Sequence, residues 1–292
     1  LNNEYSFLDT ITKELYVSWD GKYLIINGEN GWNLIDISAG SKKAIPLKCF
    51  GKPWFTKDGN NVLFEGVGAL WSYDLKNGSL SKVAAFEGFN VNIVNGISEG
   101  LNACKGNYSK NYISSGKSIV IRLFDPEKIL TSYVLLNEGR LKVIVPTTSD
   151  NIKNFNYSKY YNWFSWIEEN YNRPPDLVYK QTDRNEKIIY KSNGKDRAVF
   201  SLKQEIISYT NSDGVPLKGI LYYPLNYDCT LKYPMVVHIY QVQSKKVANE
   251  YPVVYYAKEN NDGFSLRLLL EKGYFVYFPD IVYGKMGTGL SA

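Results

Sequence analysis

Short hydrophobic runs separated by polar turn residues fill the first two thirds of the chain, and this pattern predicts β-hairpins. Asp20-Gly21 precedes an apolar run at residues 23–26, and Asp58-Gly59 precedes another at residues 62–64. Aspartate-glycine pairs beside such runs are typical of tight turns next to strands. We therefore expect a succession of short antiparallel strands in this region.

These two turns belong to an internal repeat. Asp20 is followed after 16 residues by Asp36, Asp58 is followed after 16 residues by Asp74, and the two copies are offset by 38 residues. Each copy has the order turn, strand, tight turn, strand. A period near 40 with several strands per unit is typical of β-propeller blades, because a single blade cannot bury both of its faces without neighbours.

Weaker copies of the pattern follow. We expect a strand at residues 115–121, a hairpin over residues 133–145 and an aromatic strand at residues 159–167. Two more strands are expected at residues 176–180 and 187–190. These segments amount to about four blades, and closed propellers hold roughly four to eight. A small propeller, an open arc and the end of a larger propeller all fit this count.

The last third of the chain has the pattern of an α/β domain. The nearly all-apolar residues 235–240 predict a strand covered on both faces. Asp262 is expected to cap a helix that runs to about Lys272, and residues 274–278 predict a second buried strand. Strand, helix and strand form a βαβ unit. The predicted fold is therefore mainly β with an α/β part, in two domains: β-propeller residues 1–203 and residues 204–292.

Composition supports a folded, β-rich chain and argues against two classes of protein. Hydrophobic residues make up 44% of the chain, with 25 Tyr, 13 Phe and 6 Trp, which favours strands and is too aromatic for a disordered chain. The net charge of +5 is modest and the basic residues are scattered, so nucleic-acid binding is not expected. No apolar run approaches the roughly 18 residues of a membrane span.

The sequence contains no pattern that predicts a metal or cofactor. Its three cysteines are far apart and form no C-x-x-C pair, so unpaired thiols are favoured, although one disulfide is left open. Gly116-Lys117-Ser118 lacks the first glycine of a phosphate loop, and the glycines near the C-terminus do not have dinucleotide-binding spacing. The cysteines are Cys49, Cys104 and Cys229.

Four segments carry a family resemblance: Arg173-Pro174-Pro175-Asp176-Leu177, Ser212-Asp213-Gly214 with Gly219 to Pro224, Lys232 to Tyr240, and Lys272 to Asp280 with Tyr283-Gly284 and Gly287 to Ala292. In this order and after propeller repeats, the chain resembles serine peptidases of the prolyl oligopeptidase and dipeptidyl peptidase IV class. It is most similar to their bacterial branch related to acylaminoacyl peptidases. The likeness covers residues 157–292 well and the earlier residues only as a propeller pattern.

The resemblance implies a propeller that gates access to an α/β-hydrolase domain. In the family, a nucleophilic Ser in a Gly-x-Ser-x-Gly turn, an Asp and a His follow the last matched segment, and acyl transfer needs all three. No Gly-x-Ser-x-Gly follows the last matched segment in this sequence; the one at Gly96 to Gly100 lies among the propeller repeats. We therefore expect a fragment of a serine peptidase, inactive as given, whose intact parent hydrolyses short peptides. The resemblance favours a periplasmic or secreted protein.

A second class of function is left open. The chain could be a non-enzymatic β-propeller protein, used for binding or scaffolding, that retains a hydrolase remnant. Coding sequence downstream of Ala292 distinguishes the two, because only the peptidase requires a nucleophile, an Asp and a His there.

Tyr240 is the candidate catalytic residue. In the family, a Tyr at the end of this strand gives its hydroxyl to the oxyanion hole, where a donor stabilises the negative charge that develops in the transition state. Tyr240 matches that position. The residues after it, Gln241-Val242-Gln243, differ from the Gly-rich run of many relatives.

Three other candidates are interpreted as structural. His238 lies inside a strand and does not match the family's catalytic His, which comes from a late loop. Ser291 follows Gly289-Leu290 but lies well past a strand end, so it does not match a nucleophile turn. Glu168-Glu169 resembles the paired glutamates that bind a substrate amine in dipeptidyl peptidases. Because the pair leads into a Pro-Pro turn, we expect two solvated turn carboxylates.

Overall fold

The structure is a computed structural model that describes residues 14–28, 31–46, 50–100, 108–114, 118–244, 248–253 and 264–282. The chain divides into two compact units, Leu1–Thr148 and Ser149–Ala292. The domain boundary expected between residues 203 and 204 lies inside the second unit and stays a prediction.

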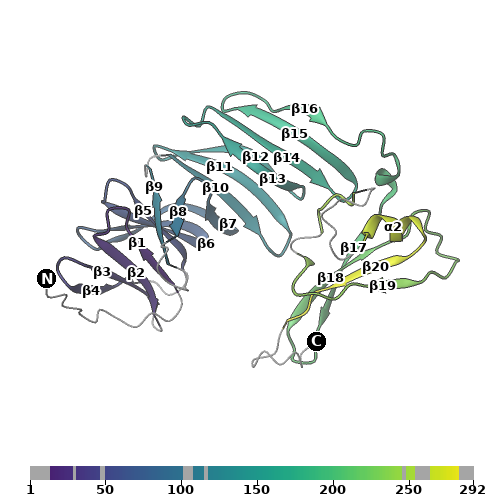
Figure 1. Ribbon diagram of the computed structural model, residues 1–292, viewed down its shortest axis with the longest axis horizontal. Helices are drawn as coiled ribbons and strands as arrows, with labels where there is room; N and C mark the ends of the chain where they lie inside the picture. Colours follow the sequence, from purple (N-terminus) through teal and green to yellow (C-terminus); the bar gives the residue numbers. More distant parts are fainter. Residues whose placement is uncertain are drawn as a thin grey trace. The chain divides into compact units, whose positions relative to one another are not determined.

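The first unit is built on one 12-stranded sheet (Figure 1). Its strands are β1 (Leu15–Val17), β2 (Tyr23–Gly28), β3 (Gly31–Asp36), β4 (Ser41–Ala44), β5 (Phe50–Thr56), β6 (Asn61–Asp74), β7 (Leu80–Ile93), β8 (Ile97–Gly100), β9 (Tyr108–Ile113), β10 (Ser118–Asp125), β11 (Leu130–Asn137) and β12 (Arg140–Thr148). The order is β12-β11-β10-β7-β6-β5-β9-β1-β2-β3-β4, with β8 beside β9. Pairing is antiparallel except where β9 meets β1 and β5. The hairpin predicted over residues 133–145 is confirmed by the pairing of β11 with β12.

The 38-residue repeat is confirmed by hydrogen bonds that recur at the same offset. In the first copy the Ser18 hydroxyl donates to Asp20 at 2.7 Å, and in the second the Thr56 hydroxyl donates to Asp58 at 2.6 Å. Both aspartates thereby fix a turn in which a glycine has positive φ. Matching backbone bonds are Gly21 N–H to Ser18 (3.0 Å), Gly59 N–H to Thr56 (2.9 Å), Ile37 N–H to Lys22 (2.9 Å) and Leu75 N–H to Asn60 (2.9 Å).

Strand β6 turns back on itself, as the predicted tight turn requires. The bond from Leu75 to Asn60 joins its two ends, and the Ser72 hydroxyl donates to the Asn61 side chain at 3.3 Å. The reversal lies at Gly68, whose φ of 78° is in the left-handed region that favours glycine. At Gly66, a Cβ atom would lie 2.8 Å from the Ala69 carbonyl oxygen, so the turn also needs a glycine there.

The two copies of the repeat share one hydrophobic core. Trp32 of the first copy packs between Tyr16, which precedes the first turn, and Phe64 of the second copy. Its ring centroid lies 5.9 Å from that of Tyr16 and 6.2 Å from that of Phe64. All three side chains are buried. Packing of this kind is how neighbouring blades cover each other's faces. The full cluster is Tyr16, Ile25, Trp32, Leu34, Ile45, Phe55, Val62, Phe64, Tyr73 and Leu75.

The second unit contains two four-stranded sheets. One, the meander sheet, consists of β13 (Asn151–Tyr157), β14 (Trp163–Asn170), β15 (Arg173–Gln181) and β16 (Lys187–Lys191). Its neighbours pair antiparallel in sequence order, which is the arrangement of a single propeller blade. The number of blades in the chain stays a prediction.

The turn before β14 repeats the turn of the first unit. The Ser158 N–H donates to the Trp163 carbonyl at 3.0 Å, and the Tyr161 N–H donates to the Ser158 carbonyl at 2.9 Å. Tyr161, with φ of 55°, takes the place of Gly21. The prediction of a strand from residue 159 was therefore wrong, because tyrosines that suggested a strand lie in this turn and the strand begins at Trp163.

The other sheet, the mixed sheet, confirms the predicted βαβ unit. It consists of β17 (Gln204–Thr210), β18 (Pro216–Tyr222), β20 (Phe275–Pro279) and β19 (Met235–Val237), in that spatial order. β19 and β20 are parallel, and helix α2 (Leu266–Glu271) lies between them in the sequence. The 3-10 helix η1 (Ala198–Ser201) precedes this sheet. β17 and β18 form a hairpin whose turn contains Asp213-Gly214.

Helix α2 is shorter than expected. Its N-cap is Ser265, whose hydroxyl accepts from the Leu268 N–H, while the predicted cap Asp262 lies outside the described residues. The helix ends before Gly273, whose φ of 83° fits the predicted stop. Its buried side chains are Leu270 and Arg267.

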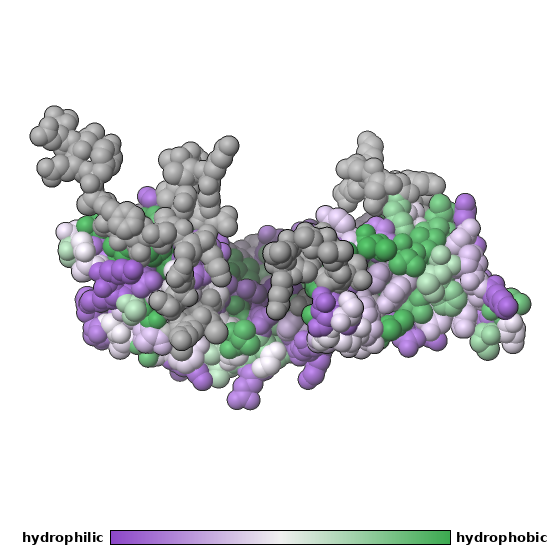
Figure 2. All heavy atoms as spheres, turned by 90° about the horizontal axis from the view of Figure 1, so that it is seen from below, coloured by the Kyte–Doolittle hydropathy of each residue, from purple (hydrophilic) through white to green (hydrophobic). Residues whose placement is uncertain are grey.

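Strand β19 differs from its prediction. Residues 235–240 were expected to be covered on both faces, but among the described residues β19 pairs only with β20 and lies at the edge of the mixed sheet. Met235, Val237 and Ile239 are 52%, 47% and 64% exposed. Figure 2 shows hydrophobic side chains gathered at the surface of the part of the chain that holds this sheet.

Candidate functional site

Tyr240 lies just beyond β19, at the edge where the parallel strands β19 and β20 both end. The His238 N–H donates to the Tyr277 carbonyl at 2.9 Å, which continues the pairing past Val237. The Tyr240 side chain is 65% exposed. Ligands of open α/β sheets bind at the carboxyl ends of the strands. The position therefore suits a hydroxyl that meets a substrate, and its catalytic role stays a prediction.

His238 packs against aromatic side chains. Its ring centroid lies 4.6 Å from that of Phe264 and 5.2 Å from that of Phe278. Its Nδ1 atom is 3.2 Å from Oε1 of Gln243. These contacts hold the ring against the mixed sheet and agree with the structural interpretation of this residue.

A buried carboxylate that was not predicted from the sequence, Asp280, lies beside the loop that follows Tyr240. Asp280 directly follows β20 and is 4% exposed. It accepts hydrogen bonds from the backbone N–H groups of Gln243 and Ser244 at 2.6 and 2.7 Å. A polar residue at the carboxyl end of a buried strand was the available signal.

The expectation of solvated carboxylates at Glu168 and Glu169 was wrong. Both residues lie in β14, and Glu169 is 5% exposed. Lys153 lies 2.6 Å from Glu169, and Arg173 lies 2.7 Å from Glu168. Burial lowers the pKa of Lys153, but its bonds to the Glu169 and Glu250 carboxylates outweigh this effect and raise the pKa overall. Glu168 and Glu169 are thus occupied by cations of the chain itself.

A second ion-pair group joins the mixed sheet's helix to the rest of the second unit. Arg267, 1% exposed, places two guanidinium nitrogens 2.8 and 3.2 Å from the Asp196 carboxylate. Its Nε lies 2.7 Å from Glu271. The Tyr251 hydroxyl donates to Asp196 at 2.8 Å, and the Tyr251 N–H donates to Glu169 at 3.3 Å. The two ion-pair groups therefore meet at Tyr251.

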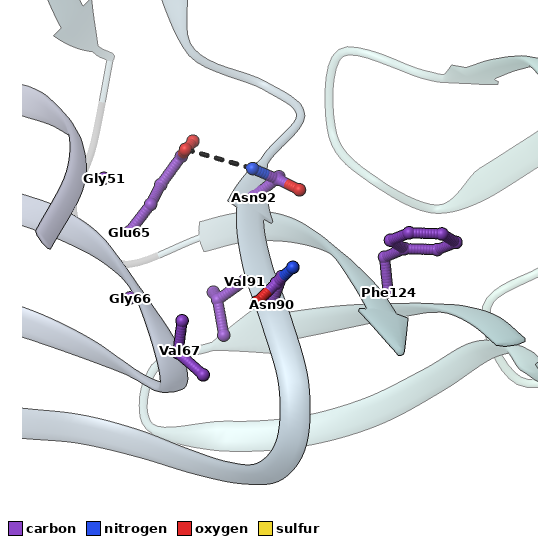
Figure 3. Close-up of a pocket in the computed structure, with 8 residues that line it drawn as sticks. All are labelled: Gly51, Glu65, Gly66, Val67, Asn90, Val91, Asn92 and Phe124. Carbon is purple, nitrogen blue, oxygen red and sulfur yellow. Dashed lines mark hydrogen bonds between the residues drawn. The ribbon is translucent and has the colours of Figure 1, made fainter. Parts of the chain in front are cut away.

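A pocket of about 370 Å³ lies in the first unit (Figure 3). Its polar centre is Glu65, which is 7% exposed. The carboxylate accepts from Trp54 Nε1 at 2.9 Å, the Ile93 N–H at 2.8 Å and Asn92 Nδ2 at 3.1 Å. Glu65 thereby ties β6 to β5 and β7. The sequence offered one signal, a charged residue inside the apolar run that begins at Val62.

Burial raises the pKa of the Glu65 carboxyl above its ordinary value, despite the opposing effect of its three donors. Because the pKa is higher in the folded than in the unfolded chain, the stabilisation linked to this proton is complete below the unfolded pKa and is lost as pH rises through the folded pKa. We therefore expect the wild-type chain to lose stability relative to Glu65→Gln as pH rises from 4 to 7.

Urea unfolding followed by tryptophan fluorescence at several pH values measures this difference. Glu87→Gln, at an exposed position of β7, controls for the loss of one negative charge. A difference between wild type and Glu65→Gln that stays constant over this pH range would contradict the prediction.

The remaining candidates carry no further site. Cys229 is a free, exposed thiol, and Cys49, Cys104, Ser291, Gly116 and Lys117 lie outside the described residues. Within the described ranges, no three side chains of His, Cys, Asp or Glu are grouped so that they could hold a metal ion. In that same part of the chain, no helix has the length and hydropathy needed to cross a membrane.

No model of a known protein family and no curated protein matches the sequence. A solved structure does share the fold. It is assigned as a dipeptidyl aminopeptidase IV from Bacteroides ovatus. The alignment covers 92% of this chain and 41% of the Bacteroides chain, with TM-score 0.55 and 13% sequence identity. The dipeptidyl peptidase 4 of Porphyromonas gingivalis matches 92% of this chain and 49% of its own, with TM-score 0.43 and 12% identity. For a prolyl endopeptidase structure, the alignment covers 95% of this chain and 54% of the endopeptidase chain, with TM-score 0.40 and 9% sequence identity.

The Bacteroides structure confirms the predicted resemblance at the level of the fold. This chain shares its fold with that structure over 92% of the chain's length. It spans about two fifths of the length of that structure.

Proposed function

We propose that this chain is part of a serine peptidase of the prolyl oligopeptidase class. It would supply propeller blades and the first strands of the α/β-hydrolase domain, within a longer polypeptide that hydrolyses short peptides. The observation that carries the proposal is the order of elements. Antiparallel meanders are followed by a parallel βαβ unit, and Tyr240 lies at the carboxyl edge of that unit.

The exposed edge of β19 supports the proposal. Exposed, apolar edge strands invite pairing with further strands, and Met235 and Val237 on β19 are about half exposed. In the proposed peptidase, another strand of the hydrolase domain pairs with β19 and covers these side chains. The nucleophilic Ser, the Asp and the His come from residues outside the present sequence.

The proposed chemistry is acyl transfer. The His takes the proton of the Ser hydroxyl, the Asp orients the His, and hydrogen-bond donors stabilise the oxyanion of the tetrahedral intermediate. Tyr240 is the donor that this chain contributes. In the family that the chain resembles, a propeller gates access to the hydrolase domain, so short peptides are the proposed substrates.

Peptide hydrolysis by the longer polypeptide tests the proposal. We expect cleavage of short synthetic peptides and no cleavage of the same sequences within a folded protein. Changing the serine of a Gly-x-Ser-x-Gly turn outside residues 1–292 to alanine should abolish the activity. If the longer polypeptide cleaves no peptide, or lacks such a serine, the non-enzymatic propeller becomes the better interpretation.

A further inference from the structure

The main chain of Asp280 is bound by residues of two other strands of the mixed sheet, β18 and β17. Its N–H donates to the Lys218 carbonyl of β18 at 2.9 Å. Its carbonyl accepts from the hydroxyl of Tyr209 on β17. With 4% exposure, Asp280 is a rigid point at the end of β20.

The carboxylate of Asp280 points to the loop that follows Tyr240. Oδ1 accepts from the N–H groups of Gln243 and Ser244 at 2.6 and 2.7 Å, and Oδ2 accepts from the Ser244 hydroxyl. Hydrogen bonds to an ionised acceptor are shorter and stronger than neutral ones. Three donors from two adjacent residues therefore attach this loop to β20.

The Gln243 side chain binds the backbone at Tyr240 and so links it to Asp280. Its Nε2 donates to the carbonyls of His238 and Tyr240 at 3.1 and 3.4 Å. Its Oε1 lies 3.2 Å from Nδ1 of His238. The Ile281 N–H donates to the Gln241 carbonyl at 3.4 Å. The backbone on both sides of Tyr240 is thus held while its side chain extends into solvent.

From this geometry we propose that Asp280 is a positioning residue for the Tyr240 hydroxyl, acting through Gln243. The inference rests on the proposed function, in which that hydroxyl stabilises the oxyanion. Donors contribute to catalysis only when they are held in place before the charge develops. The sequence after Tyr240 lacks the Gly-rich run of many relatives, and the Asp280 carboxylate supplies the rigidity of the Gln-Val-Gln loop that stands there.

The first experiment measures kcat and KM for a short peptide in the longer polypeptide, with Asp280→Ala, Tyr240→Phe and the double variant. We expect Asp280→Ala to lower kcat by about tenfold or more, because the Tyr240 hydroxyl is then no longer held where the oxyanion forms. KM should stay nearly unchanged, because this hydroxyl interacts with the transition state and not with the bound substrate. The double variant should be no slower than Tyr240→Phe. Asp280 acts through the Tyr240 hydroxyl, so its removal has no further effect on the rate once that hydroxyl is absent. Asp280→Asn, which keeps Oδ1 as an acceptor, should recover most of the rate.

The second experiment uses the 292-residue chain and does not depend on activity. His238 is its only histidine, so the imidazole ¹H–¹⁵N signals report on this loop alone. Asp280→Ala should shift or broaden them, whereas Asp228→Ala, at an exposed turn where the Asp228 carboxylate accepts from Thr230, should not.

The outcomes separate this inference from the proposed function. If Tyr240→Phe lowers kcat but Asp280→Ala does not, or if the two effects multiply, the inference is overturned and the proposed function stands. An unchanged His238 signal in Asp280→Ala also overturns the inference. If Tyr240→Phe leaves kcat unchanged, the oxyanion role and the inference fall together.

Discussion

Tyr240→Phe is expected to lower kcat of the longer polypeptide by about 10²-fold, the order of effect that follows removal of one oxyanion donor. KM should change little, because the hydroxyl acts on charge that develops only in the transition state. Steady-state kinetics with a short peptide measure both values. The phenyl ring keeps the packing of tyrosine, so a loss of rate reports on the hydroxyl alone.

Tyr160→Phe is the matched control for this prediction. Tyr160 is 77% exposed and lies in the turn before β14, in the meander sheet. Its change should leave kcat and KM within a factor of about two, as expected for a surface substitution away from the site. Equal kcat values for wild type and Tyr240→Phe would remove Tyr240 from the proposed catalytic machinery.

Arg267→Met is expected to destabilise the second unit by about 3–5 kcal/mol, the cost of removing one partner of a buried ion pair. Arg267 is 1% exposed and binds both Asp196 and Glu271. Burial lowers its pKa, but the bonds to these two carboxylates outweigh that effect and raise the pKa overall. Methionine fills similar volume and leaves Asp196 buried without its cation.

Urea unfolding followed through the His238 imidazole signals measures this effect, because the only histidine lies in the second unit. Arg184→Met, at an exposed turn, makes the same chemical change where no buried charge is left behind. It should shift the free energy of unfolding by no more than about 0.5 kcal/mol. Equal unfolding midpoints for the two variants would show that the Arg267 pair does not stabilise the unit.

Local chemistry explains what the sequence predicted well. The Asp20 and Asp58 turns depend on side chains two to five residues away, so their pattern is visible in the chain itself. The hairpin at Asp213-Gly214 depends likewise on adjacent residues. The same local bonds occur in the turn at Ser158. This turn was not predicted, because Tyr161 stands where the other two turns have a glycine.

Features set by distant residues were mispredicted or missed. Glu169 was expected in solvent because its cation, Lys153, comes from another strand. β19 was expected to be covered because its apolar composition does not tell which strands lie beside it. The role of Asp280 depends on donors 36 and 37 residues away in the sequence. Contacts at such separation follow from the fold and not from spacing.

The most direct test of the proposed peptidase is labelling with a fluorophosphonate, which reacts with activated serines. The 292-residue chain should remain unlabelled at every serine, Ser291 included, because no Gly-x-Ser-x-Gly follows the matched hydrolase segments and Ser98, within Gly96 to Gly100, lies in strand β8 of the first unit. The longer polypeptide should be labelled once, at a serine outside residues 1–292, as mapped by mass spectrometry. Stoichiometric labelling of a serine within residues 1–292, or none in the longer polypeptide, would contradict the proposal.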